Sequence, residues 1–435
     1  MPAPETRAIL PADHPQRFAL HNEVHARPHE ALQAPTRLSM LALLVDADQR
    51  GREHAHVAEL CRRCGVHPPA EDAIHFSSDM GVFRLRWERH SEFTTYAFLR
   101  AGASAQPFAE PAILSVPQDW LGATPGQTVF AAHAELLADA EHGASPEKAA
   151  AHFGGNALIG AEIAGDAALA LTDFRVHADG FGRILVYGRQ LTPALAGRLM
   201  QRLLEIETYR MMALLALPLA RAAAPRVASM ERELAQISAT IAGERSADEP
   251  TLLDQLTRLA VAVENAVAEG RFRFAAARAY HDLVLSRIAE LREQRVSGMQ
   301  TIGEFMARRL APAMATCESV ARRQLELSGR VERASSLLRT RVDIVREKQN
   351  QQLLASMDRR ARLQLRLQET VEGLSVAAIT YYVVGLVGYA ARGIAALGAD
   401  VPIDIVTAAS IPLVAVLVAL GVRQIRRSVI RGSQG

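Results

Sequence analysis

Two charge-free apolar runs close to the C-terminus constrain the fold of this chain more than any other feature. The first is LSVAAITYYVVGLVGYAA (374–391) and the second is IVTAASIPLVAVLVALGV (405–422). A helix that crosses the hydrocarbon core needs about 20 apolar residues, and both runs reach that length with their apolar neighbours. We therefore predict a two-helix transmembrane hairpin within 371–435, with helices at about 374–397 and 403–422. A buried helical pair in a soluble core is the alternative.

The charges around these runs predict the orientation of the hairpin. Four arginines lie within 359–366 and four more within 423–431, whereas only Arg392, Asp400 and Asp404 are charged between the runs. Because basic flanks stay on the cytoplasmic side, we expect a multi-pass protein of the bacterial inner membrane with both termini in the cytoplasm. No basic segment followed by an apolar run opens the chain, so we expect no secretory signal. We therefore expect the lipid bilayer to be a partner of this protein.

Seven residues of the hairpin are candidates for lining a pore or packing helices together. They are Tyr381, Tyr382, Gly385, Gly388, Tyr389, Asp400 and Asp404. The glycines would allow close approach of helices, and the central placement of the tyrosines favours helix packing over a lipid-facing belt. The two loop aspartates would attract cations to the outer end.

Residues 223–370 have the composition of long helices, rich in Ala, Leu, Arg, Glu and Gln. We predict helices at about 251–270 and 273–298, and a third that begins near residue 313 and continues into the first span. A helix of that length cannot bury itself on a small domain. We therefore expect coiled-coil-like pairing with further copies of the chain, and hence a homo-oligomer.

A polar run, EKQNQQ (347–352), interrupts the apolar spacing of that third helix. The heptad-like spacing is kept by Val331, Leu338, Val342 and Val345, and it fails at Gln349 and Gln352. The four amide side chains are Gln349, Asn350, Gln351 and Gln352. They either line a water-filled axis between copies or form a solvated face, and the weak periodicity favours the solvated face.

Residues 1–222 read as an α+β cytoplasmic domain with a mixed, partly antiparallel sheet. Strands are predicted at 37–45, 82–90, 93–99, 157–164, 167–176 and 183–188, and helices at 50–64 and 193–217. The second helix is apolar but contains charges, so we do not expect it to cross a membrane.

Composition excludes several classes of protein. The 49 basic and 47 acidic residues leave a net charge of +2, which excludes nucleic-acid binding through bulk positive charge. Three cysteines exclude a disulfide framework and fit a reducing compartment.

Two clusters of residues could carry chemistry. The first cluster could bind zinc, because thiolates and imidazoles are zinc ligands; it consists of His54, His56, Cys61, Cys64 and His67. An ordinary surface helix is favoured here, since a structural zinc site usually has a second ligand pair.

The second cluster is HNEVHARPHE (21–30), in which Glu23, His25, His29 and Glu30 could exchange protons or bind a metal. No nucleophile motif accompanies it, so an arm held by ion pairs is favoured. We predict no catalytic residues, and a divalent cation is the one cofactor considered.

Four motifs together carry a resemblance to a known family. They are NEVHARP (22–28), WERHSEF (87–93), QNQQLL (349–354) and VEGLSVAAITYYVVGL (371–386). The chain resembles a widespread bacterial family of predicted membrane-anchored proteins that share a domain of unknown function. That resemblance implies the membrane topology and no catalytic residues.

A second resemblance is one of architecture. An α/β domain, long helices that lead into a first span, a hairpin and a basic tail are similar to the CorA-type divalent-cation channels. Those channels are pentamers in which the first span lines the pore and carries a Gly-Met-Asn signature at its outer end. Here residues 388–400 read GYAARGIAALGAD, without that signature, so the resemblance does not imply magnesium selectivity.

Two functions follow as hypotheses. The first is an oligomeric, CorA-like ion channel or transporter with Asp400 and Asp404 as an acidic ring at its outer mouth. The alternative is a membrane-anchored scaffold or sensor whose cytoplasmic domain binds a ligand or a partner protein.

Overall fold

The computed structural model describes residues 11–18, 20–21, 29–139, 145–243, 249–397 and 402–432. Contacts divide the chain into two compact units, Met1–Ser335 and Ser336–Gly435. The boundaries predicted near residues 222 and 370 both fall inside long helices.

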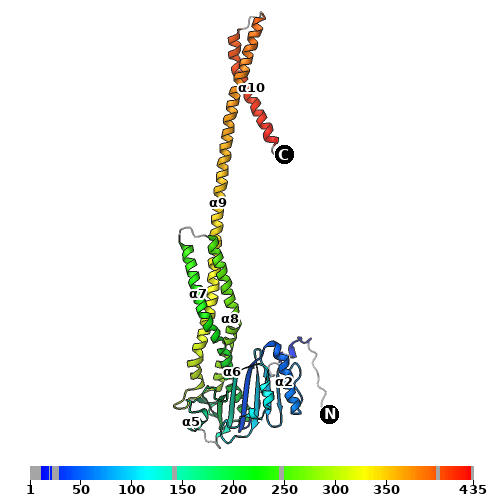
Figure 1. The fold of residues 1–435 in the computed structure, drawn as a ribbon, viewed down its shortest axis with the longest axis vertical. Helices are drawn as coiled ribbons and strands as arrows, with labels where there is room; N and C mark the ends of the chain where they lie inside the picture. The colour runs from blue at the N-terminus through cyan, green and yellow to red at the C-terminus, as the bar shows by residue number, and fades with distance from the viewer. Residues whose placement is uncertain are drawn as a thin grey trace. The chain divides into compact units, whose positions relative to one another are not determined.

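An eight-stranded mixed sheet forms the centre of the first unit, within the described residues (Figure 1). Its strands are β1 (Thr36–Leu44), β2 (His75–Asp79), β3 (Arg84–Arg89), β4 (Phe93–Ala101), β5 (Gln127–Ala138), β6 (Ile159–Ile163), β7 (Ala168–Thr172) and β8 (Gly182–Gly188). They lie in the order β2-β3-β4-β1-β5-β8-β7-β6, and only the β5–β8 pair is parallel. The prediction of a mixed sheet after which long helices follow is confirmed.

The sequence prediction missed two of these strands. β5 is rich in alanine and carries the buried polar residues His133 and Glu135, so apolar and polar positions do not alternate along it. β2 is the short, polar edge strand HFSSD, whose composition is closer to that of a loop.

Alternating residues of β1 face two different hydrophobic cores. Leu38 and Met40 belong to the core that includes α6 (Pro193–Leu214), whereas Leu41 and Leu43 belong to the core beneath α2 (Arg50–Arg63). The second face also carries α3 (Gln118–Gly122), and α5 (Pro146–Ala150) precedes the segment that packs beside β7 and β8. Because both faces are covered, the inner strands are largely buried, whereas the edge strand β2 is only half-buried. The sheet can therefore hold charged side chains away from water.

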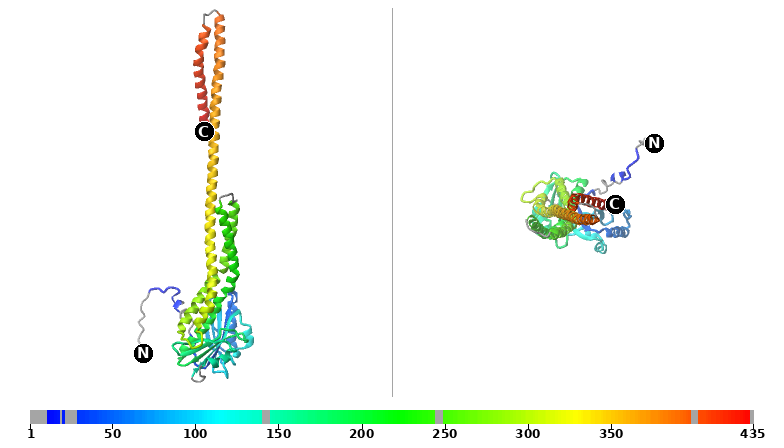
Figure 2. Two further views of the ribbon diagram at one scale, coloured as in Figure 1. Left: turned by 90° about the vertical axis from the view of Figure 1, so that its left-hand side faces the viewer. Right: turned by 90° about the horizontal axis from the view of Figure 1, so that it is seen from above.

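Three long helices follow α6: α7 (Ala216–Ala242), α8 (Glu249–Leu291) and α9 (Ile302–Ala396). Figure 2 shows α7 and α8 side by side from a second direction. Within the first unit, Arg323 of α9 forms an ion pair with Glu231 of α7 at 2.7 Å, and the Gln324 amide donates to the carbonyl of Ala266 on α8 at 3.1 Å. These contacts join the first part of α9 to both neighbours as a three-helix bundle.

The predicted helix boundaries need two corrections. The helices expected at 251–270 and 273–298 are one helix, because Gly270 lies within α8 under the ring of Phe274 and does not end it. α9 begins at Ile302 and not near 313. Thr301 and Glu304 form a capping box there, since the Glu304 amide donates to Thr301 Oγ1 at 3.1 Å and the Thr301 amide to Glu304 Oε2 at 3.2 Å.

The second unit consists of the rest of α9 and of α10 (Ile403–Gly432). The two helices meet near Gly388, where an added Cβ would lie 3.6 Å from Thr407 Oγ1. Among the described residues, three helical stretches are long and apolar enough to cross a membrane: Pro193–Ala242, Ile302–Ala396 and Ile403–Ile425.

Candidate functional site

A cavity of about 50 Å³, with mainly apolar walls and several polar groups, lies between α6 and the strands β1, β3 and β4. Its apolar walls include Leu38, Met40, Phe93, Ala97, Leu99, Met200 and Leu204. Its polar walls include Glu30, Arg86, Glu88, His90, Thr95, Gln201, Glu205, Thr208 and Tyr209. A space of this size holds a few water molecules or one small polar molecule.

Arg86 of β3 is the central charge of this cavity. Its side chain is only 10% exposed, and it donates to Glu88 Oε1 from Nε at 3.1 Å and from Nη2 at 2.6 Å. Nη1 and Nη2 also donate to Gln201 Oε1 of α6, each at 3.3 Å. A buried guanidinium is stable only when its donors are satisfied, and these two partners satisfy it from a strand and a helix.

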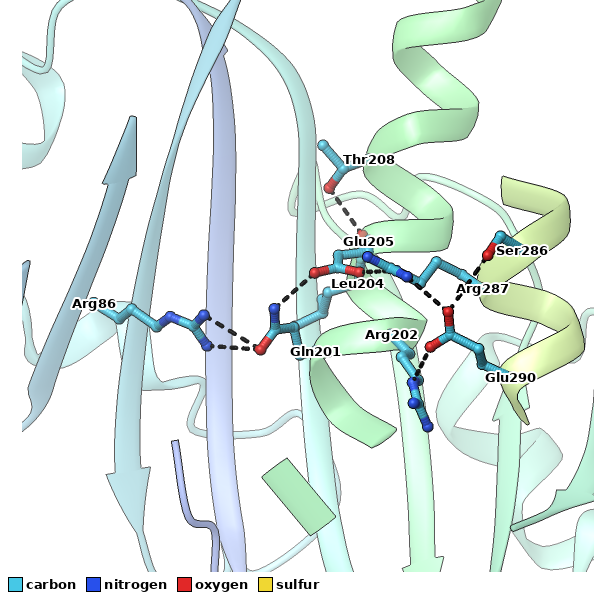
Figure 3. Close-up of polar contacts among 9 residues, drawn as sticks. All are labelled: Arg86, Gln201, Arg202, Leu204, Glu205, Thr208, Ser286, Arg287 and Glu290. Carbon is cyan, nitrogen blue, oxygen red and sulfur yellow. Dashed lines mark hydrogen bonds and ion pairs between the residues drawn. The ribbon is translucent and has the colours of Figure 1, made fainter. Parts of the chain in front are cut away.

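A chain of polar contacts leads from Gln201 to α8 (Figure 3). The Gln201 amide donates to Glu205 Oε1 at 2.7 Å, and Glu205 forms an ion pair with Arg287. Arg287 also contacts Glu290 at 2.8 Å, and Glu290 contacts Arg202 at 2.7 Å. This series of side-chain contacts therefore connects β3, α6 and α8, with the neutral Gln201 between Arg86 and Glu205 and with opposite charges in contact beyond it.

The charged side chains in this series of contacts stabilise one another. Burial opposes the charge of Arg287, but the carboxylates of Glu205 and Glu290 outweigh burial and raise the pKa of its guanidinium. Burial likewise raises the pKa of Glu290, yet the nearby Arg287 and Arg202 outweigh that effect, so the pKa is lowered. Both groups are thus held in their charged forms.

The WERHSEF motif supports the cavity from the strand side. Trp87 Nε1 and Arg89 Nε donate to the fully buried carboxylate of Glu53 on α2, at 3.1 and 3.3 Å. Glu92 forms an ion pair with Arg273 of α8 at 2.9 Å. The motif therefore ties the sheet to helices on both of its faces.

The balance of charge indicates what the cavity can accept. Glu30, Glu88 and Glu205 contribute three carboxylates to its lining; Glu88 is paired with Arg86 and Glu205 with Arg287, and Glu30 accepts a hydrogen bond from Ser77. The carboxylate oxygens offer acceptors to a small cation or to a neutral molecule rich in hydrogen-bond donors.

The structure does not bring the five candidate zinc ligands together. His54 Nε2 lies 3.0 Å from the carbonyl of Ala70, and His56 stacks on Trp120 with ring centroids 4.3 Å apart. Cys61 is buried and burial raises the pKa of its thiol to about 11, which disfavours the metal-binding thiolate; Cys64 is half-buried and His67 is exposed. In the described part of the chain, no group of three or more His, Cys, Asp or Glu side chains could hold a metal ion.

The hairpin candidates gather along one groove between α9 and α10. Tyr381, Tyr382, Gly385, Gly388, Tyr389 and Asp404 all line it, together with Arg392. Asp400 lies outside the described residues. Of the two glycines, only Gly388 approaches the neighbouring helix, whereas a Cβ on Gly385 would meet open space.

The remaining candidates are placed as follows. Gln349, Asn350, Gln351 and Gln352 are all exposed on α9, where Gln351 donates to Glu347 at 3.1 Å. In the arm, Glu23 and His25 lie outside the described residues. Glu30 lines the cavity and accepts a hydrogen bond from Ser77 Oγ, so it connects the cavity to the edge strand β2.

A family model described as "Protein of unknown function (DUF3422)" matches residues 12–429. The chain belongs to this family. No curated protein and no solved structure matches it. The family description names no activity, so the cavity and the groove carry the functional argument.

Sequence reasoning missed the helical half of the cavity. The side chains of α6 and α8 that continue the polar contacts from the cavity are Gln201, Arg202, Glu205, Arg287 and Glu290. One signal was available: Gln201 and Glu205 are four residues apart and therefore lie on one side of the helix, among several other charged residues of an apolar-rich segment. Charged residues inside an apolar helix require partners, and these partners come from β3 and α8.

Proposed function

We propose that this protein is a membrane-anchored sensor, in which the end of α9 and α10 cross the bilayer as a hairpin and the α/β domain binds a small cationic or donor-rich ligand on the cytoplasmic side. The supporting observation is a contrast in burial. In the apolar windows of α9 and α10 only 6% of residues are buried, with mean hydropathies of 1.7 and 2.5. In the α6–α7 stretch 33% are buried and the mean hydropathy is 1.3, because its apolar side chains pack on the sheet.

Membrane anchoring is tested by fractionation. The full chain should stay in the membrane pellet after alkaline carbonate washing, because two apolar helices hold it there. A chain that lacks residues 371–435 should move to the supernatant. Full-length protein that is released by carbonate would contradict the anchor.

Ligand binding is tested on the purified full chain in detergent. Ammonium, methylammonium and guanidinium ions serve as probes, and the measurement is the shift in thermal midpoint. We expect a shift that is lost in Glu88→Gln and kept in Glu59→Gln, whose carboxylate lies on the exposed side of α2. Equal shifts in both variants, or none in the parent, would contradict the cavity as the ligand site.

Ion conduction is the second candidate. It is favoured by the groove that gathers Tyr381, Tyr382, Tyr389 and Asp404, because aromatic hydroxyls and a carboxylate can replace water around a cation. In liposomes, Asp404→Asn should lower the flux of a divalent cation. A parent protein without flux would remove this candidate.

A further inference from the structure

One apolar stripe runs along α9 toward the first apolar span. It consists of Leu338, Val342, Val345, Leu353, Leu363, Leu367, Val371 and Leu374, interrupted by Gln349, Ser356 and Arg360. The steps between neighbours are 4, 3, 4, 4 and 3 residues, and this order occurs twice. The mean step is therefore about 3.6 residues, the period of a straight α-helix, so the stripe keeps to one side of the helix.

From Val345 onward this stripe is uncovered in the single chain, whereas Leu338 at its start is buried and Val342 is half-buried. Leu353 is 61% exposed, Leu367 68% and Val371 58%, and Val345 and Leu363 are exposed as well. Isolated helices are marginal in water, and burying an apolar face normally supplies most of their stability. A stripe of this length thus requires an apolar partner of similar length.

We propose that the stripe packs against the same stripe of a second copy, parallel and in register. This inference rests on the proposed membrane anchor: α9 of every copy enters the bilayer from the same side, so two adjacent copies run in the same direction. The uncovered part of the stripe, from Val345 to Leu374, is about 45 Å long at 1.5 Å per residue, and a helix is about 10 Å wide. The contact is then roughly 450 Å² per copy, somewhat more than half of the ~800 Å² per partner in stable interfaces.

In this arrangement, two of the residues that interrupt the apolar stripe affect how the copies pack. Gln349 faces Gln349 of the second copy, where the two amides can donate to each other, and a polar pair within an apolar contact specifies register. Arg360 faces Arg360, and this repulsion weakens the contact. Because the period is 3.6 and not 3.5, the two helices lie nearly straight rather than in a left-handed supercoil.

Cysteine cross-linking in native membranes tests the contact. The full chain carries Cys61→Ala, Cys64→Ala and Cys317→Ala, and then one cysteine on the stripe, Leu353→Cys or Leu367→Cys. The matched controls are Glu347→Cys and Glu369→Cys, which lie on the opposite side of α9 at 100° per residue. After mild oxidation, we expect disulfide-linked dimers for the stripe variants at several times the yield of the controls.

A second variant keeps the inference falsifiable if a stripe cysteine weakens the contact. Arg360→Leu removes the repulsion and should raise the dimer fraction of the parent in detergent, measured by mass. Monomers in the membrane pellet, equal yields on both sides of the helix, or cross-links to another protein would overturn the contact. Protein missing from the pellet would contradict the anchor instead, so the two failures are distinguishable.

Discussion

Arg273 of α8 donates hydrogen bonds to both carboxylate oxygens of Glu92, at 2.9 and 3.2 Å, across 181 positions of sequence. Both side chains are less than 20% exposed. The pair joins the turn before β4 to the helical bundle, next to the cavity formed by Arg86 and Gln201. Because two hydrogen bonds join the same two side chains, they fix the orientation of α8 relative to this turn as well as the distance between them.

Removing this pair should destabilise the protein measurably. Glu92→Gln leaves Arg273 with a neutral partner in a mostly buried place, and we expect a loss of about 1–3 kcal/mol in the free energy of unfolding. Glu269→Gln is the control, because its ion pair with Arg226 is about half exposed and should be worth about 0–1 kcal/mol. Denaturant unfolding of the full chain in detergent measures both, and equal losses would contradict the role of the Glu92 pair.

Gly197 should tolerate no side chain. A Cβ at this position in α6 would overlap the backbone carbonyl oxygen of Glu30, and backbone cannot yield as a flexible side chain can. We expect Gly197→Ala to lower stability by about 1–3 kcal/mol. Gly51→Ala in α2, where the space is open, should be neutral or stabilising by up to about 1 kcal/mol. Thermal unfolding of the two variants checks the difference.

His133 should make the protein less stable in mild acid. Ser39 Oγ accepts from the Ile113 amide at 3.2 Å and lies 2.9 Å from His133 Nδ1, so its hydroxyl proton is free to bond the neutral imidazole. Burial lowers the pKa of His133 to about 4, against an ordinary value of 6.5.

The sign of the pH effect follows from proton uptake. Below pH 6.5 the unfolded chain binds a proton at His133 that the folded chain does not, so this contribution is present above 6.5 and is lost as the pH falls toward 4. The loss is on the order of 3 kcal/mol. His133→Gln should flatten the pH dependence of the unfolding midpoint in this range, and an unchanged slope would rule His133 out as its source.

The contact between α9 and α10 can be checked by an engineered disulfide. Gly388→Cys with Thr407→Cys places two cysteines where the helices approach within ordinary van der Waals distance. In the cysteine-free chain we expect this pair to form an intramolecular disulfide under oxidation. Gly385→Cys with Thr407→Cys is the control, because Gly385 faces open space and should leave both thiols free. The readout is thiol labelling after denaturation.

Periodicity and composition alone predicted much of the fold. Helical structure over the two apolar runs, six of the strands and α2 were predicted correctly, because each has a strong local signal. The sequence prediction placed helix boundaries at Gly270 and just after Pro312, but α8 and α9 continue through these residues. The heptad spacing fails at Gln349 because that position is polar, and it fails at Gln352 because the next apolar position of the stripe is Leu353, one residue later.

The amino-acid sequence by itself determined which segments are apolar enough to leave water and which strands can be buried, since both depend on neighbouring residues alone. Only the tertiary structure decided that Arg86 meets Gln201 and that His54 Nε2 contacts the carbonyl of Ala70. The physical reason is distance along the chain. Arg86 and Gln201 are 115 positions apart, and only the packing of α6 on the sheet brings their side chains within hydrogen-bond reach.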